Sequence, residues 1–287
     1  MARLRRPVNG VEDAAGSVRP IFVLGCPRSG TTVVSSYVGT TPGVCDLGEY
    51  GGFYLALHHA PRELGRAPSP VRASYQASLE AHALGFPAAE AATAGCVWYV
   101  DGTPWNLLVV NELLRLVPHA LLVLCLRDFR GVIQSLRRSY DEGYKYAGAT
   151  PEESASLWVR FYERALALPV GQTVVVSFDR LCEKPSEEIA RLEGALSRHG
   201  LPQGRSMEVF ARSHAVPEGS VRPTVFSVDR VAGTAEFRPR ELYDRVAWLD
   251  EIERSVAGIV GEVDARLRTR FRSRCGWSPP REQGGTW

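Results

Sequence analysis

The chain has 287 residues, of which 45% are hydrophobic, so it is long enough to bury a full core, and one large domain is expected. Its formal net charge is only +2, which excludes the strong global field of a protein that binds nucleic acid or an anionic membrane surface. No run approaches the roughly 18–20 apolar residues of a membrane span, so none is predicted.

The cysteines and the N-terminus indicate a compartment. The six cysteines form no C-x-x-C pair, and Cys26, Cys96 and Cys125 fall in or beside expected core strands, where a free thiol acts as a small apolar group. This usage favours a reducing environment and predicts no metal site. Residues 1–19 indicate a flexible polar arm without an apolar segment, so no secretion signal is predicted and a cytoplasmic location is expected.

The first expected core elements surround a glycine-bracketed loop. Ile21–Leu24 is predicted to be a buried strand, Gly25–Gly30 a tight loop and Thr31–Gly39 a helix. This order forms an anion cradle, because backbone N–H groups point into the loop and the helix dipole adds positive partial charge. The G-x-x-x-x-G spacing is that of a phosphate-binding loop, but Thr31 stands where a lysine is expected, and the positive charge lies inside the loop at Arg28.

Strands and helices alternate through the rest of the chain. After a short extended piece at 44–45 and a flexible Gly-rich segment at 46–52, residues 53–94 are expected to be helical with breaks at prolines, including Pro87. A loop is predicted at 139–150, and another at 202–239. Further strands are expected at 97–100, 120–126 and 173–178, and helices at 105–116, from about 128, and at 150–168, 185–199 and 240–271.

The alternation predicts the fold class. It indicates an α/β fold in which a parallel sheet carries helices on both faces, in the style of P-loop nucleotide-binding proteins. Residues 20–275 are expected to form one domain, followed by a frayed tail at 276–287 that is rich in Pro and Gly.

A second candidate ligand site follows the most apolar strand. Arg127 stands at the expected C-terminal end of that strand, where ligands bind in open α/β sheets. Ser135 lies eight residues later, about two turns into the next helix, so both side chains could contact one phosphate.

Both motifs resemble those of sulfotransferases. The letters PRSGTT resemble the 5′-phosphosulfate loop of the tyrosylprotein and carbohydrate-type branch, and R-D-x-R-x-x-x-x-S resembles the family's 3′-phosphate motif. The resemblance implies transfer of a sulfuryl group from 3′-phosphoadenosine 5′-phosphosulfate (PAPS) to a hydroxyl of a small-molecule, lipid or glycoside acceptor, with no metal and with 3′,5′-adenosine bisphosphate as product. It implies that the 5′ side is held by Arg28, Ser29, Gly30, Thr31 and Thr32, and the 3′-phosphate by Arg127 and Ser135.

Glu49 is the favoured general base. It lies 21 residues after Arg28, the offset at which the tyrosylprotein branch carries a glutamate, in a segment that could fold over the loop. A glutamate needs desolvation to become an effective base, and Tyr50 and Phe53 could supply apolar walls. His58 or His59 is the second candidate, and Asp46 is the third.

One position departs from the family pattern. Several branches place a lysine in the turn after the second strand, where it donates to the bridging oxygen or the sulfuryl group, and Gly102 stands there in this chain. Arg28, Lys145 or another arginine could take over that role, and Thr103 could still donate its hydroxyl. Contacts to adenine and the distal phosphate are expected from the loop at 220–240, with these candidates: Arg222, Ser227, Arg230, Arg238 and Arg240.

Two other functions stay open at this point. The loop is compatible with a small-molecule kinase or a nucleotide hydrolase, against which the missing lysine and the Arg127 and Ser135 pair argue. A nucleotide-binding protein that has lost catalysis is the other, because of Gly102. The sequence does not name the acceptor, and it leaves a homodimer open.

Overall fold

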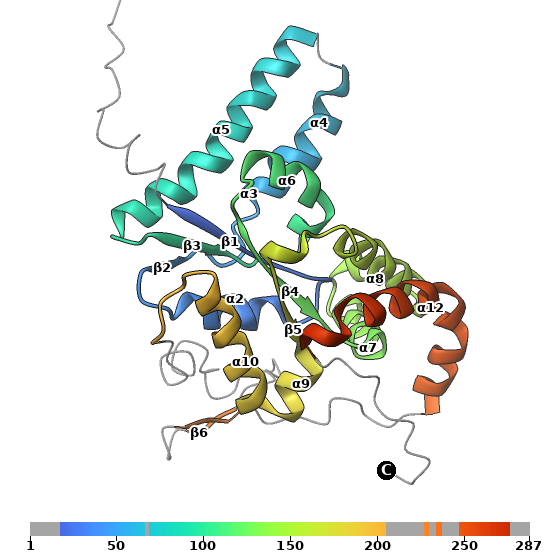
Figure 1. Ribbon diagram of the computed structural model, residues 1–287. Helices are drawn as coiled ribbons and strands as arrows, with labels where there is room; N and C mark the ends of the chain where they lie inside the picture. Colours follow the sequence, from blue (N-terminus) through green and yellow to red (C-terminus); the bar gives the residue numbers. More distant parts are fainter. Residues whose placement is uncertain (1–17, 67–68, 205–226, 230–233, 237–246, 276–287) are drawn as a thin grey trace, which may run out of the picture.

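The computed structural model describes residues 18–66, 69–204, 227–229, 234–236 and 247–275 (Figure 1). Residues 1–17 of the expected arm and the expected tail at 276–287 lie outside these ranges. Four candidates for the adenine contact lie outside them too: Arg222, Arg230, Arg238 and Arg240. Ser227 begins a short strand, but its side chain is not among those described.

A five-stranded parallel sheet forms the centre of the molecule, as the sequence predicts. The strand order is β2-β3-β1-β4-β5, so β1 lies in the middle, with Ile21 opposite both Val100 and Leu121. Each of β1, β3, β4 and β5 is apolar and almost entirely buried, because helices cover both faces. The strands are β1 (Arg19–Leu24), β2 (Val44–Asp46), β3 (Trp98–Asp101), β4 (Leu121–Leu126) and β5 (Thr173–Ser177).

Two apolar clusters attach the helices to the two faces of the sheet (Figure 1). One face packs on α2 (Thr31–Gly39), α9 (Phe178–Glu183) and α10 (Pro185–Arg198). The other face packs on the 3₁₀-helix η3 (Pro104–Val109), α6 (Val110–Leu116), α7 (Phe129–Asp141), α8 (Pro151–Ala165) and α12 (Ala247–Cys275). All loops that follow the strands therefore meet at one edge of the sheet, where the site lies.

A helical excursion links β2 to β3, and it ends in the long helix α5, which extends away from the sheet in Figure 1. The expected break at Pro87 is wrong, since α5 continues through it. Proline removes one helical hydrogen bond, but the buried face of Pro87, Ala88 and Ala91 holds the helix together there. Its elements are α3 (Gly52–Tyr54), the π-helix η1 (Leu55–His59), α4 (Ala60–Glu63), the 3₁₀-helix η2 (Leu64–Arg66) and α5 (Ser69–Thr93).

Other predicted boundaries need correction. The loop expected at 139–150 contains the end of α7 and a 3₁₀-helix, η4 (Lys145–Ala147), whose Ala147 is buried. The loop expected at 202–239 contains an antiparallel pair, and α9 was not predicted because it is only one and a half turns long. The pair consists of β6 (Ser227–Asp229) and β7 (Thr234–Glu236), and a further 3₁₀-turn, η5 (Val170–Gln172), precedes β5.

None of the helices within the described ranges combines the length and the apolar character that crossing a membrane requires.

Candidate functional site

The loop between β1 and α2 has an unusual backbone. Arg28 has φ 73° and Gly30 has φ 90°, both in the left-handed region. Such a conformation costs a residue with a side chain about 1 kcal/mol or more, and it persists only where the surroundings enforce it. At Gly30 a side chain could not be accommodated, because a Cβ would lie 2.2 Å from the ring of Phe178. The loop is therefore held in one shape that projects Arg28 outward.

Ser29 fixes this loop from beneath. Its side chain is fully buried, and its hydroxyl shares a 2.8 Å hydrogen bond with the hydroxyl of Tyr162, which donates to the carbonyl of Cys125 on β4 at 2.9 Å. The Ser29 amide donates to the carbonyl of Cys26 at 3.0 Å. Both polar groups of Ser29 are thus used inside the protein, and its predicted contact with a cofactor stays a prediction.

The N-terminus of α2 faces the open side of the loop. Gly30 caps the helix without a side-chain hydrogen bond, and the first amides of a helix have no acceptor within it, so they are available to an anion. Thr31 is buried with its methyl group near Gly25, whereas Thr32 is exposed. Of the two threonine hydroxyls, that of Thr32 is the accessible one.

The two predicted anchors meet directly. Arg127 donates from Nη1 to the backbone carbonyl of Arg28 at 2.8 Å, and Arg28 donates from Nε to the Ser135 hydroxyl at 2.9 Å. Arg127 is only 8% exposed, yet its Nε has no hydrogen-bond partner among the described residues. A buried guanidinium N–H without a partner is costly, and an anion bound at this point would satisfy it. The residues present therefore fit a phosphate-bearing ligand.

The turn from β5 into α9 supports both anchors. The ring of Phe178 lies beneath Gly30 and also beneath the Arg127 guanidinium, whose central carbon is 4.8 Å from the ring centroid. Asp179 accepts a 2.8 Å hydrogen bond from the amide of Asp128. One short turn therefore sets the position of the loop and of Arg127 together.

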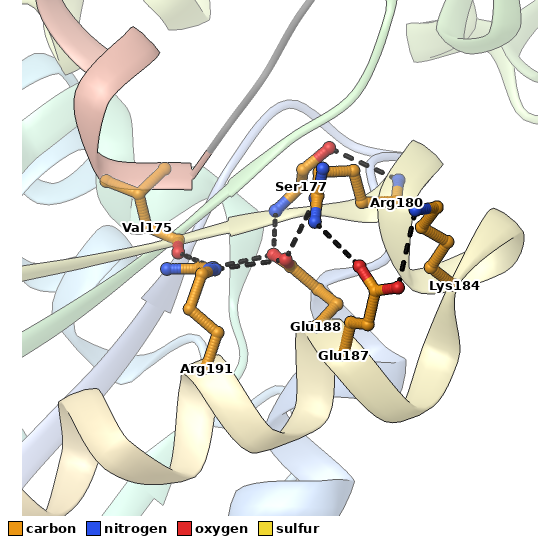
Figure 2. Close-up of polar contacts among 7 residues, drawn as sticks. All are labelled: Val175, Ser177, Arg180, Lys184, Glu187, Glu188 and Arg191. Carbon is orange, nitrogen blue, oxygen red and sulfur yellow. Dashed lines mark hydrogen bonds and ion pairs between the residues drawn. The ribbon is translucent and has the colours of Figure 1, made fainter.

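A buried carboxylate holds that turn in place (Figure 2). Glu188 of α10 is fully buried and accepts hydrogen bonds from the Ser177 amide at 2.8 Å and from Arg191 at 2.6 and 3.0 Å. Arg180 lies 3.5 Å from the same carboxylate, and Arg191 also donates to the carbonyl of Val175. The turn is thus anchored by a charge that is paired and hydrogen-bonded within the protein.

Glu49 lies beside the loop, next to the start of α2. It accepts a 3.2 Å hydrogen bond from the Thr32 hydroxyl, and its side chain is exposed. Partial burial of the carboxyl group raises its pKa, the bond from Thr32 lowers it, the charge of Asp101 raises it and that of Arg28 lowers it, with a net upward shift. A raised pKa makes Glu49 a stronger base than a free glutamate.

The alternative bases are placed differently. Asp46 accepts a hydrogen bond from the Gly48 amide at 2.9 Å and so shapes the turn before Glu49. His58 stacks on Tyr54 with ring centroids 4.7 Å apart, and burial lowers its pKa. His59 contacts the edge of the same tyrosine ring at 5.0 Å. No contact joins any of the three to Arg28 or Thr32 within the described part of the chain, whereas Glu49 bonds Thr32 directly.

Comparisons with known proteins indicate the family and the fold. The sulfotransferase family profile matches residues 20–199. The chain belongs to the sulfotransferase family. In solved structures, sulfotransferase STF9 from Mycobacterium avium matches with a TM-score of 0.51 at 15% identity, over 88% of this chain and 79% of that one, which supports the shared fold.

Two curated relatives both carry the name "Putative protein-tyrosine sulfotransferase". The one from Caenorhabditis briggsae is 27% identical over 188 residues, which is 61% of this chain and 64% of the relative. The one from Caenorhabditis elegans is 28% identical over 99 residues, or 32% of this chain and 37% of the relative. The chain therefore aligns with less than two thirds of the length of either relative.

This sulfotransferase has no room for a side chain at Gly102. A Cβ there would lie 2.4 Å from the Ser35 hydroxyl and 3.3 Å from the carbonyl of Gly48, to which the Gly102 amide donates at 2.7 Å. Thr103 next to it donates to the buried Asp101 at 2.5 Å and accepts from the Gly51 amide at 2.9 Å, so its hydroxyl is already used. The turn therefore presents backbone and committed side chains only.

Sequence reasoning missed several supporting residues. Tyr162 bonds Ser29, Phe178 packs beneath Arg127, and Asp179 accepts from the amide of Asp128. A tyrosine on the apolar face of a helix and a phenylalanine after a strand look like ordinary core residues in the sequence. Lys145, a predicted substitute donor, lies over the ring of Tyr140 at 4.2 Å. Phe53, predicted to line the base, is fully buried against Phe22 instead, with ring centroids 5.1 Å apart.

Proposed function

We propose that this sulfotransferase moves a sulfuryl group from PAPS to a hydroxyl of its acceptor. The observation that carries the proposal is the junction of the two anchors, where Arg127 bonds the carbonyl of Arg28 and keeps a buried Nε without a partner. A nucleotide with phosphate on both its 3′ and 5′ sides would supply anions to both anchors, whereas ADP would supply only the 5′ side.

The proposed roles follow from these positions. The amides at the start of α2, the Thr32 hydroxyl and the Arg28 guanidinium would hold the 5′-phosphosulfate and stabilise charge on the leaving phosphate. Arg127 and Ser135 would hold the 3′-phosphate. Catalysis of this kind relies on positioning and electrostatic stabilisation, as in phosphoryl transfer, so donors fixed in advance favour it.

Glu49 would take the proton of the acceptor hydroxyl. Its bond to Thr32 keeps it at the edge of the anion cradle, and its raised pKa suits a general base. The acceptor would approach along the rings of Tyr54, His58 and Trp105. The ring centroids of Trp105 and Tyr54 are 5.8 Å apart, and Tyr54 stacks on His58. A wall of aromatic rings suits an acceptor with an apolar or ring-shaped body, as in a lipid or a glycoside.

Calorimetry tests the donor assignment. We expect the wild-type protein to bind 3′,5′-adenosine bisphosphate more tightly than ADP. Arg127→Ala should weaken bisphosphate binding by roughly a hundredfold, because a buried charge-assisted contact is lost, and should weaken ADP binding much less. Arg115→Ala, which removes an exposed arginine on α6, is the control and should change neither. A preference for ADP, or equal losses for both ligands, would overturn the proposal.

The Gly102 turn favours a second candidate function, a nucleotide-binding protein without transferase activity. Its signature would be tight binding of the bisphosphate together with intact PAPS after prolonged incubation with hydroxyl acceptors and water. Turnover of PAPS to the bisphosphate would reject it.

A further inference from the structure

Transfer of a sulfuryl group places negative charge on three oxygens around sulfur, and each of them needs a donor. Arg28 and the first amides of α2 can donate hydrogen bonds to these oxygens from the loop. The turn after β3 offers no donor, since Gly102 packs on Ser35 and the Thr103 hydroxyl is committed to Asp101 and Gly51. A further donor must come from another element.

Tyr146 is the candidate for such a further donor. Its ring packs edge-on against Trp105, which lies two residues after Thr103, with centroids 5.4 Å apart. It is also close enough to Arg28 and Glu49 for their charges to shift its pKa in opposite directions. The ring of Tyr146 therefore packs beside the turn that lacks a donor, within range of the charges of the loop and of the proposed base.

The segment that carries Tyr146 is fixed to the body of the protein. Ala147 is fully buried, and its carbonyl accepts a 2.8 Å hydrogen bond from the buried hydroxyl of Ser154 on α8. Arg137 of α7 donates to the carbonyl of Gly148 at 2.8 Å. A short 3₁₀-helix held at its end in this way positions the preceding side chain without any ligand.

The Tyr146 hydroxyl itself is available. Among the described residues it has no hydrogen-bond partner, and the residue is 41% exposed. Burial is the largest influence on its pKa and raises it, so the phenol keeps its proton at neutral pH and acts as a donor.

We propose that Tyr146 is a catalytic residue, whose hydroxyl donates a hydrogen bond to a sulfuryl oxygen. This inference rests on the proposed function. In the step, the bond between sulfur and the phosphate oxygen breaks and its electrons stay on the phosphate, while the acceptor oxygen bonds to sulfur and gives its proton to Glu49. Tyr146 keeps its own proton and stabilises the oxygens in transit.

The test compares two ligands that differ only in the sulfuryl group. Dissociation constants of PAPS and of 3′,5′-adenosine bisphosphate are measured for wild type, Tyr146→Phe and Tyr144→Phe, in the absence of an acceptor. Tyr146→Phe should weaken PAPS by about 10- to 100-fold and leave the bisphosphate unchanged, since only PAPS carries the oxygens that lose a donor. It should also slow the transfer of the sulfuryl group to water by at least the same factor. Tyr144 is an exposed neighbour, and its variant should match wild type.

Each outcome is decisive. If Tyr146→Phe binds both ligands as wild type does and releases sulfate at the wild-type rate, the inference is wrong while the proposed function stands. Equal weakening for both ligands would mean that the hydroxyl supports the nucleotide site and makes no specific contact with the sulfuryl group, which would also overturn the inference. A wild-type protein that binds neither ligand, or prefers ADP, would instead reject the proposed function itself.

Discussion

The two sides of the site are built in different ways. On the donor side, which comprises the loop 25–30, Arg127 with Asp128, and the turn 177–179, polar groups are buried and bonded to one another, from the Ser29 hydroxyl to the Glu188 carboxylate. On the proposed acceptor side, which comprises residues 46–59 and η4, Glu49 is exposed, and within the described part of the chain its carboxylate makes one hydrogen bond, to Thr32 at 3.2 Å.

This difference separates what a sulfotransferase holds constant from what it can vary. A donor nucleotide needs the same phosphate contacts in every reaction, so its side is best fixed in advance of binding. Half-exposed rings and a lightly held carboxylate allow the other side to fit different acceptors. The comparison predicts that changes on the acceptor side alter turnover, whereas changes on the donor side alter stability and nucleotide affinity.

The largest effect is expected from Glu49→Gln, which should lower the turnover rate without weakening nucleotide binding. Loss of the general base should lower the rate of sulfuryl transfer by about 10²–10⁴-fold, because the acceptor proton then has no strong acceptor. The affinity for 3′,5′-adenosine bisphosphate should stay within a factor of two or three, since the amide keeps the contact to Thr32. Single-turnover transfer and calorimetry measure the two quantities.

The pH profile supplies the control for that variant. Because the pKa of Glu49 is raised, the active carboxylate should be lost as pH falls through a midpoint above that of an ordinary glutamate. In Glu49→Gln this acid limb should disappear. If the variant keeps the acid limb of the wild-type profile, a group other than Glu49 must be responsible for that limb.

Glu188→Ala should have the next largest effect, on stability. It leaves Arg191 and the Ser177 amide without their buried partner, so the free energy of unfolding should fall by about 3–5 kcal/mol. Glu187→Ala is the matched control, because Glu187 is 59% exposed and pairs with Arg180 and Lys184 at the surface. It should cost about 0–1 kcal/mol. Denaturant unfolding measures both, and equal costs would refute a supporting role for Glu188.

Gly102→Ala tests the close contact in the turn after β3, which is packed as tightly as the donor side. Its Cβ would meet Ser35 at 2.4 Å, so we expect a loss of about 1–3 kcal/mol in unfolding free energy. Gly85→Ala on α5, where a Cβ meets nothing within 4 Å, should instead gain about 0.5–1 kcal/mol from helix propensity. A neutral Gly102→Ala would show that the turn can move to admit a side chain.

Ser29→Ala should have the smallest effect, a loss of about 1 kcal/mol, because Tyr162 keeps its bond to Cys125 after the serine hydroxyl is removed. Ser36→Ala on α2 is a control with no expected loss. If Ser29 were mainly a ligand, nucleotide affinity would fall while thermal unfolding stayed unchanged, which would contradict the structural role.

The sequence predicts the sheet well, and the site in part. Runs such as Leu121–Leu126 are apolar on both faces, so their strand state and burial follow from composition alone. The junction of Arg28, Arg127 and Ser135 could be expected because both motifs follow parallel strands, whose C-terminal ends share one edge. The roles assigned to these residues and to Glu49 stay predictions.

What escaped prediction depends on contacts between distant segments. Tyr162 is 133 residues from Ser29, and no local pattern marks it as the partner of a loop. The continuation of α5 through Pro87 was missed for a similar reason, since packing outweighs the local preference of proline. The sequence shows that Gly102 departs from the family pattern. The reason that only glycine fits there, the close approach of the Ser35 side chain, is visible only in three dimensions.

The π-helix η1 has an evolutionary consequence. Leu55–His59 holds one residue more than an α-helical turn would, and Tyr54, His58 and His59 touch one another across it. Deletion of a single codon there would restore regular winding and remove one side chain from this wall, while the helical turns on either side keep their relative orientation. The acceptor preference could thus change through a single deletion, while the proposed nucleotide-binding residues at the edge of the sheet stay the same.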